Sequence, residues 1–92
     1  MRFDITYHER VVDSDIPKLG STTKLQIKKA IEAKLTSEPH LYGKPLRGSA
    51  KGYWKLRVGE YRVIFRIEKT IVKIFIIAHR SVVYTKLDTR VR

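Results

Sequence analysis

The sequence predicts an α+β fold: a small antiparallel β-sheet with an N-terminal strand, followed by a helical hairpin packed on one face. Three observations predict it. Apolar residues alternate with polar ones near the N-terminus, recur at spacings of three and four over residues 9–36, and alternate again over residues 53–79. A chain of 92 residues is expected to form a single domain spanning 1–92, with a core shared by all elements.

The N-terminal third is predicted to contain one strand and two helices. Alternation over 2–7 indicates a half-buried strand, and helical spacing over 9–36 indicates a helical hairpin. Gly20 and Ser21 mark the join between the two helices, as a C-terminal stop and an N-cap. The apolar positions of the two helices are Val12, Ile16 and Leu19, then Ile27, Ala30, Ile31 and Leu35.

Three strands are predicted in the rest of the chain. Residues 37–52 carry two prolines and three glycines and form the longest irregular stretch. Strands over 53–58 and 61–67 are joined by a two-residue turn at Gly59 and Glu60, which pairs Arg57 with Arg62. A third strand covers 71–79, after a turn at 68–70.

This pairing predicts an apolar face and a cationic face. The face expected under the helices carries Trp54, Leu56, Val58, Tyr61, Val63, Phe65, Ile67, Val72, Ile74, Ile76 and Ala78. The opposite face carries Tyr53, Lys55, Arg57, Arg62, Ile64, Arg66, Lys73, Phe75, Ile77 and His79. Like charges placed opposite each other weaken a sheet by up to about 1 kcal/mol per pair, so a cationic face suggests an anionic ligand.

Positive charge is concentrated in the second half of the chain. Residues 1–43 have a net charge of +1 and residues 44–92 a net charge of +10, out of +11 in total. This asymmetry favours a polyanionic partner, with phosphate backbones the commonest. A solvated basic surface, or binding to acidic lipid, remains the alternative. Aromatic residues between the arginines favour RNA, because unpaired bases stack on rings and guanidinium groups.

The composition argues against several other classes of protein. The chain has no cysteine, so disulfides and thiolate zinc sites are excluded. Its apolar runs are far shorter than the roughly 20 residues that span a bilayer, and no signal-peptide core is evident. We therefore expect a cytoplasmic protein with no membrane partner.

Three motifs in order, L-R-G, R-V-G-E-Y-R and H-R-S-V-V-Y, resemble those of the RelE/ParE superfamily, the toxins of type II toxin–antitoxin systems. The resemblance covers nearly the whole chain and implies the RelE-like microbial RNase fold. It points to the RelE-like branch. That branch implies an mRNA interferase, an endoribonuclease that needs no metal and no small-molecule cofactor and that cleaves mRNA in the A site of the translating 70S ribosome. The ribose 2′-hydroxyl attacks the adjacent phosphate, and translation is inhibited.

The resemblance also implies roles for individual residues. Arg62 is expected to bind the scissile phosphate, Tyr84 to pack on the base and transfer a proton, and Lys55 to stabilise charge or activate the 2′-hydroxyl. Two family positions differ: Tyr53 replaces a lysine, and Ala78 lies near the position of an arginine, for which Arg80 or His79 is a substitute. The full expected set comprises catalytic Arg62, Tyr84, Lys55 and Arg80, and RNA-binding Arg57, Arg47, Lys51, Arg66 and His79.

Two alternatives to the RNase follow from the same resemblance. The ParE-like branch uses this fold as a non-enzymatic inhibitor of DNA gyrase, and its members generally lack the arginine and tyrosine pair. A catalytically weak relative would only bind its antitoxin. In every case the implied partner is an acidic cognate antitoxin, which we expect to meet the cationic sheet or the helical hairpin.

Overall fold

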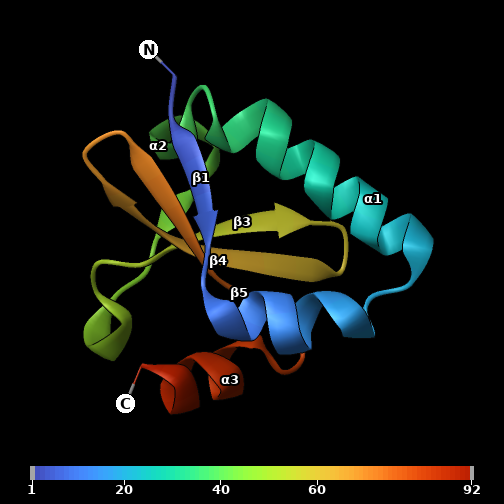
Figure 1. Ribbon diagram of the computed structural model, residues 1–92. Helices are drawn as coiled ribbons and strands as arrows, with labels where there is room; N and C mark the ends of the chain where they lie inside the picture. Colours follow the sequence, from blue (N-terminus) through green and yellow to red (C-terminus); the bar gives the residue numbers. More distant parts are fainter. Residues whose placement is uncertain (1, 92) are drawn as a thin grey trace.

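The computed structural model describes residues 2–91, which form a five-stranded sheet covered by helices on both faces (Figure 1). The strand order is β1-β5-β4-β3-β2. The strands are β1 (Asp4–Tyr7), β2 (Lys44–Pro45), β3 (Trp54–Val58), β4 (Tyr61–Glu68) and β5 (Ile71–His79). β1 runs parallel to β5, whereas the other pairs are antiparallel, so the sheet is mixed. The predicted α+β class is confirmed, with this one parallel pairing as a refinement.

The helical hairpin predicted over 9–36 is confirmed. Its first arm contains η1 (Val11–Asp15), a π-helical turn, and η2 (Ile16–Lys18), a 3-10 turn that includes Pro17. The second arm is α1 (Ser21–Ala30), continued by the π-helical turn η3 (Ile31–Leu35). The prediction that Ser21 is the N-cap of this helix is wrong, because Gly20 is the N-cap and Ser21 the first helical residue. Leu25, which lies off the apolar stripe, is 52% exposed.

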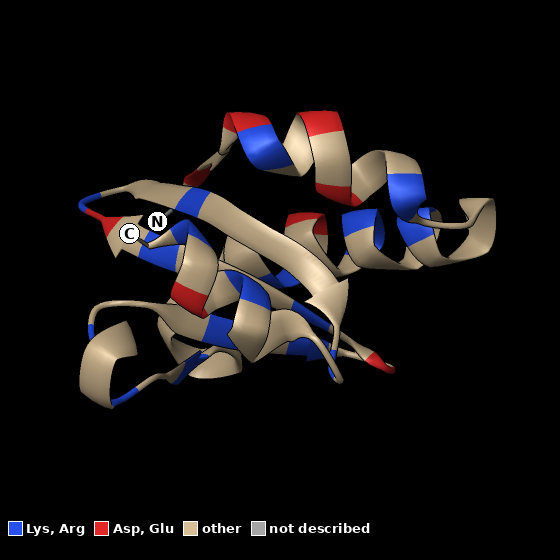
Figure 2. Ribbon diagram, turned by 90° about the horizontal axis from the view of Figure 1, so that it is seen from below, with Lys and Arg blue, Asp and Glu red and all other residues tan. Residues whose placement is uncertain are grey.

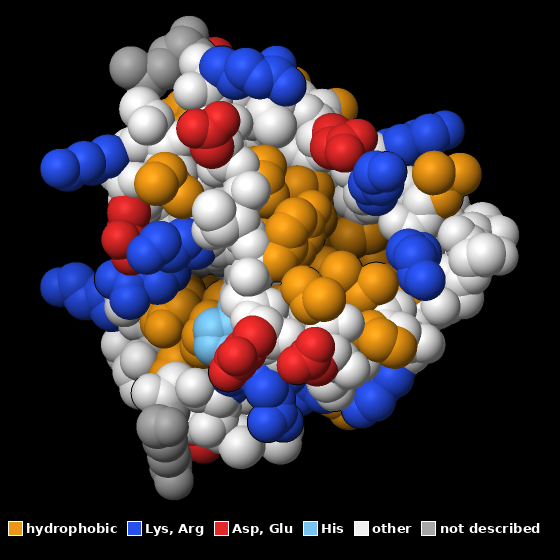
Figure 3. All heavy atoms as spheres, viewed as in Figure 1, with side chains coloured by type: hydrophobic (Ala, Val, Ile, Leu, Met, Phe, Trp, Pro, Cys, Tyr) orange, Lys and Arg blue, Asp and Glu red, His pale blue; other side chains and the backbone are white. Residues whose placement is uncertain are grey.

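The hairpin packs on one face of the sheet and encloses the larger core. The buried members are Phe3, Val11, Ile27, Ile31, Leu35, Leu56, Val63, Phe65, Val72, Ile74 and Ile77. The face of β3 and β4 expected under the helices is therefore confirmed. Hydrophobic side chains remain visible between β1 and the hairpin, where Tyr7, Ile16, Ile27 and Ile77 line a shallow depression (Figure 3).

The turn between β3 and β4 has the predicted register. Val58 pairs with Tyr61 and Arg57 with Arg62, and Gly59 has φ +58°, a conformation that glycine adopts without steric cost. The two-residue turn is therefore confirmed.

A β-bulge changes which side chains of β5 face the hairpin. Ile64 pairs with Ile76 and Phe65 with Ile74, so Phe75 is left without a partner and the alternation shifts by one residue. The prediction that Ile76 and Ala78 lie under the hairpin is wrong, because both pack on the other face. The placement of Ile77 on the cationic face is also wrong, because it belongs to the hairpin core.

His79 is also displaced by the bulge. It pairs with Tyr61, and the two rings meet edge to face at 5.5 Å. Because Tyr61 packs against the hairpin core, His79 lies on the hairpin side. Its expected position on the cationic face is therefore wrong.

The sequence patterns missed α3 (Val83–Arg90), which follows β5. Its residues Val83 and Leu87 pack on Ile64, Ile76 and Ala78 and bury part of the face that was expected to be open and cationic. Residues 37–52, expected to be irregular, contain two short helical pieces besides β2. These are α2 (Pro39–Tyr42) and the 3-10 turn η4 (Gly48–Ala50).

Candidate active site

A contact between Lys55 and Tyr84 lies at the centre of the candidate site. Lys55 is the second residue of β3, on the face turned away from the hairpin, and Tyr84 is the second residue of α3. The Lys55 Nζ donates a hydrogen bond of 3.2 Å to the Tyr84 phenolic oxygen and lies 5.9 Å from the ring centroid. Tyr84 is 49% exposed, so a ligand can reach its ring and hydroxyl. The structure thus joins two residues that the sequence singled out separately.

Arg62 lies two residues along β4 from Ile64, the partner of Lys55, on the same face. Its Nη1 donates to the carbonyl oxygens of Gly59 at 3.0 Å and Tyr61 at 2.9 Å. These bonds direct the guanidinium to the turn between β3 and β4. Within residues 2–91, no hydrogen bond or ring contact joins Arg62 to Tyr84.

Two more arginines, Arg57 and Arg80, belong to the same end of the sheet as Arg62. Arg57 is its cross-strand partner on β3. Arg80 follows β5, its N–H donates to the Glu60 carbonyl at 2.8 Å, and its Nε lies 3.5 Å from the Glu60 carboxylate. Arg62 and Arg80 are therefore both attached to the Gly59–Glu60 turn, and this end of the sheet carries three guanidinium groups.

The structure shows the surroundings of Ala78, which stands near the position of the family's arginine. Ala78 pairs directly with Arg62 and is only 4% exposed, beneath α3. Of the two proposed substitutes for the missing arginine, Arg80 lies at the turn that holds Arg62. His79 instead bonds through its Nδ1 to the hydroxyl and backbone N–H of Ser81, on the hairpin side.

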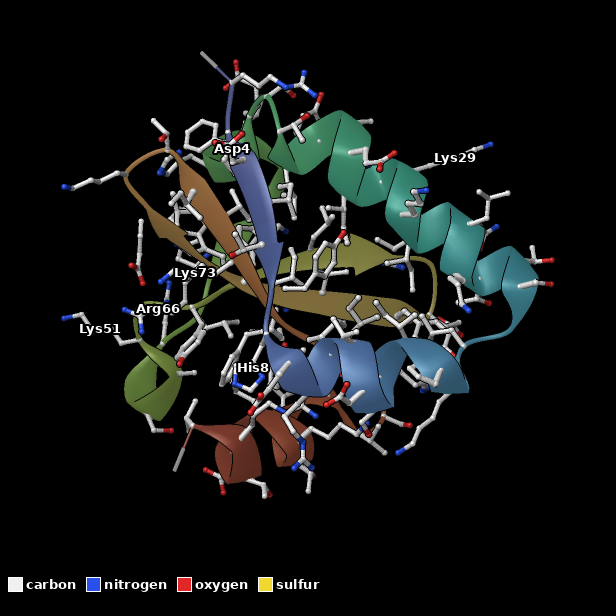
Figure 4. All side chains as sticks on the ribbon, viewed as in Figure 1. Asp4, His8, Lys29, Lys51, Arg66 and Lys73 are labelled. Atoms are coloured by element: carbon white, nitrogen blue, oxygen red, sulfur yellow. The ribbon has the colours of Figure 1, made fainter. Side chains whose placement is uncertain are left out.

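An aromatic stack extends the site along the sheet. Tyr53 immediately precedes β3, its ring packs on Phe75 at 5.0 Å, and the Arg66 guanidinium lies 5.3 Å from its centroid. Arg66 and Lys73 are cross-strand partners (Figure 4). The Glu68 carboxylate lies 3.9 Å from the Arg66 Nε and 3.1 Å from the Lys73 Nζ.

The loop residues Arg47 and Lys51 flank the 3-10 turn η4. Arg47, Ser49 and Ala50 form one wall of an open groove, and Tyr84 and Leu87 of α3 form the other. Lys51 is exposed at the end of η4. Viewed from below, basic residues mark the strands and α3, with few acidic residues among them (Figure 2).

Asp15, which contacts α3 through Arg90, was not among the residues predicted from the sequence. Its carboxylate is buried and bonded to Arg90, 75 residues away in the chain. Because this contact is tertiary, no local pattern could reveal it. The helix itself had a weak signal, since Val83 and Leu87 are four residues apart.

Residues 2–91 contain no cluster of three or more His, Cys, Asp or Glu side chains that could hold a metal ion. Within the same residues, no helix is long and apolar enough to cross a membrane.

This chain is similar in sequence and in structure to proteins of toxin–antitoxin systems. The family described as "ParE toxin of type II toxin-antitoxin system, parDE" matches residues 7–84. Toxin RelE of Mycobacterium tuberculosis is 31% identical over 97 aligned positions that cover all of both chains. The toxin in the RelBE2 toxin–antitoxin complex of the same organism has a TM-score of 0.81 and 28% identity, covering 87% of this chain and 100% of that one.

Two more distant structures share the fold. A mutant of E. coli toxin RelE in the free state has a TM-score of 0.76 and 22% identity, covering 98% of this chain and 94% of that one. The archaeal RelE–RelB complex of Pyrococcus horikoshii gives a TM-score of 0.61 and 20% identity, covering 87% of this chain and 97% of that one.

Proposed function

This chain belongs to the RelE/ParE superfamily of toxins from type II toxin–antitoxin systems, and we propose that it is a ribosome-dependent mRNA endoribonuclease. The observation that carries the proposal is the contact between the Lys55 ammonium and the exposed Tyr84 phenol, beside a surface rich in arginine. A cation next to a phenol can move a proton and stabilise an anion, and both are needed for RNA cleavage.

The proposed reaction is an internal transesterification of RNA. The ribose 2′-oxygen bonds to the phosphorus of the adjacent phosphate, and the bond from phosphorus to the 5′-oxygen of the next nucleotide breaks. The 2′-hydroxyl gives up a proton and the departing 5′-oxygen gains one. The products are a 2′,3′-cyclic phosphate and a 5′-hydroxyl, and their formation passes through a phosphorane with extra negative charge.

The residues of the site are assigned to these steps. Tyr84 stacks on the base beside the scissile bond and transfers a proton through its hydroxyl, while Lys55 stabilises the charge of the phenol or of the 2′-oxygen. Arg62 binds the phosphate, for which its guanidinium must turn from the Gly59 and Tyr61 carbonyls toward the RNA. Arg80 is a neighbouring donor at the same turn.

The surrounding basic residues are proposed to hold the rest of the RNA. Arg57, Arg66, Arg47 and Lys51 supply phosphate contacts on either side of Tyr84. Because the substrate is mRNA in the ribosomal A site, the protein would act in the cytoplasm. As a toxin of such a system, it has an antitoxin partner, which we propose is acidic.

The proposal is tested by adding purified protein to a cell-free translation reaction and mapping mRNA ends by primer extension. We expect discrete cuts within codons. Arg62→Ala should reduce the cleavage rate by about 10²- to 10³-fold and Tyr84→Phe by about 10²-fold or more, as for removal of a charge-stabilising donor or a proton-transfer group. Intact mRNA at protein concentrations that stop cell growth would contradict the RNase function.

Tyr42 offers a matched control for Tyr84. It is 47% exposed and has the Lys34 Nζ 5.6 Å from its ring centroid, close to the 49% and 5.9 Å of Tyr84 and Lys55. Tyr42→Phe should leave cleavage unchanged. An equal loss in both variants would mean that the effect is unrelated to the site.

Gyrase inhibition is the second candidate, because the matching family description names ParE toxins. It would be favoured if the protein left mRNA intact but produced DNA cleavage complexes with purified gyrase, and if Tyr84→Phe kept this activity. If neither activity were found, the protein would be a relative that only binds its antitoxin.

A further inference from the structure

Asp15, at the end of η1, is the only charged residue that is buried among residues 2–91. Its carboxylate accepts hydrogen bonds from Arg90 Nη1 at 2.8 Å and Nη2 at 3.0 Å, and from the backbone N–H of Ile77 at 2.9 Å. The Nζ of Lys86 lies 3.5 Å away. A fully buried carboxylate with three hydrogen-bond donors and one further ion pair thus links three segments of the chain: η1, β5 and α3.

The Asp15–Arg90 ion pair also supplies hydrogen bonds to the edge of β5 where no neighbouring strand does so. β1 ends at Tyr7, and the last bond in its direction runs from the His8 N–H to the Ile74 carbonyl. Beyond that point Asp15 accepts from the Ile77 N–H, and Arg90 Nη1 donates 3.0 Å to the Phe75 carbonyl. Since buried backbone groups need partners, the Asp15–Arg90 pair satisfies the edge that β1 leaves open.

The same pair anchors the helix that carries Tyr84. α3 has only eight residues, too few to be stable alone, so its position depends on its contacts. Arg90 is its last residue and Tyr84 its second. A rigid helix clamped at its C-terminal end and packed through Val83 and Leu87 has little freedom to move Tyr84 relative to Lys55.

We propose that Asp15 is a positioning residue, which clamps α3 through Arg90 and thereby holds the Tyr84 hydroxyl against Lys55. Asp15 lies outside the RNA-binding face and touches no candidate catalytic side chain. The catalytic consequence rests on the proposed RNase function, whereas the clamp itself is a property of the free protein.

Amide hydrogen exchange of the free protein tests the clamp without any activity. Asp15→Asn should speed exchange of the amides in α3 at least tenfold, while the slowest amides of β4 and β5 should lose protection only in proportion to the fall in the free energy of unfolding, which denaturant unfolding measures separately. Asp13→Asn removes the same charge from an exposed position on the same turn and should have no effect. Unchanged protection of α3 in Asp15→Asn would overturn the proposal.

Arg90→Lys covers the case in which Asp15→Asn fails to fold. It retains the charge but loses the two-armed contact with Asp15 and the bond to Phe75, so α3 should loosen by a smaller factor, about threefold to tenfold. If α3 in a folded Arg90→Lys protein exchanges as in the wild type, the clamp is not needed and the proposal fails.

A double-mutant comparison in the translation assay tests whether the clamp acts through Tyr84. Asp15→Asn should lower the cleavage rate about tenfold to a hundredfold in the wild-type background, but less than twofold in a Tyr84→Ala background. If Asp15→Asn lowers the cleavage rate by the same factor in both backgrounds, the positioning role is overturned, because a general loss of stability affects both backgrounds alike. If the wild type does not cleave mRNA, the RNase function fails, and hydrogen exchange alone decides on the clamp.

Discussion

At the scale of single residues, α3 makes two polar contacts with the rest of the chain that differ in exposure, one through Tyr84 and one through Arg90. Lys55 and Tyr84 meet at the surface, where water screens their interaction and a ligand can replace it. Asp15 and Arg90 meet in the interior, where loss of one partner leaves a buried charge without compensation. The exposed contact is therefore open to a substrate, whereas the buried contact contributes to the stability of the fold.

Asp15 should make stability depend on pH in the acid range. Burial raises the pKa of its carboxyl, but the Arg90 hydrogen bonds, the Ile77 N–H and the charges of Arg90 and Lys86 together lower it below 3.8. A depressed native pKa contributes stability that is present above the unfolded value and lost as pH falls through the native value. The free energy of unfolding should therefore fall below about pH 4 partly because Asp15 becomes protonated.

Denaturant unfolding of the wild type and Asp15→Asn checks this prediction. At pH 7 the variant should be less stable by about 3 kcal/mol, the scale expected when one partner of a buried pair is removed. The difference should shrink as pH falls below the unfolded value of about 3.9 and through the lower native value, because the wild-type carboxyl then becomes protonated as well. A difference that stays constant over this range would contradict the predicted ionisation.

At the scale of elements, the bulge in β5 divides the sheet between two cores. Val72, Ile74 and Ile77 pack against the hairpin, and Ile76 and Ala78 pack against α3. Without the extra residue at Phe75, strict alternation would place Ile76 and Ala78 under the hairpin and Ile77 on the side of α3. The bulge thus determines which apolar residues of β5 contact the helix that carries Tyr84.

The approach of Gly43 to the sheet gives a second prediction at this scale. A Cβ at Gly43, which follows α2, would lie 2.5 Å from Phe65 Cζ and 2.9 Å from the Pro39 carbonyl oxygen. Because Phe65 is fully buried and cannot move aside, Gly43→Ala should cost about 1 to 3 kcal/mol of unfolding free energy.

Gly20→Ala is the control for Gly43→Ala in thermal or denaturant unfolding. A Cβ at Gly20 meets nothing within 4 Å. There the entropy lost by the unfolded chain and the poorer N-cap should offset each other to within about 0.5 kcal/mol. Equal stability of the two variants would show that the space at Gly43 is not limiting.

At the scale of the whole molecule, positive charge is distributed unevenly between the hairpin and the rest of the chain. Residues 44–92 carry +10 of the +11, and this half supplies β2 to β5 and α3. The positive charges in these elements repel one another and destabilise the free protein. Binding to RNA phosphates or to a partner rich in carboxylates neutralises them.

Binding of short single-stranded RNA should therefore depend strongly on salt. Arg47→Gln and Lys51→Gln should each reduce the slope of log affinity against log salt concentration by about 0.7 to 1, because each removes one phosphate contact. Fluorescence anisotropy over a range of salt concentrations measures this slope. Lys29→Gln, on the outer side of α1 (Figure 4), should leave it unchanged, and an equal effect of all three would indicate nonspecific attraction alone.

The sequence alone determined those features that depend on local order. Alternation placed β3 and β4, helical spacing placed the hairpin, and the Gly59–Glu60 turn set the register that brings Arg57 opposite Arg62. The motifs also indicated Lys55, Arg62 and Tyr84 as a set.

Only the tertiary structure decided how these residues meet. The bulge at Phe75 moved Ile77 and His79 to the hairpin side, α3 covered Ile64 and Ala78, and Asp15 found its partner 75 residues away. Periodicity records which residues are apolar, but not where a strand inserts an extra residue or which distant groups satisfy a buried charge. Those choices depend on packing and on the pairing of buried polar groups, which exist only once the chain has folded.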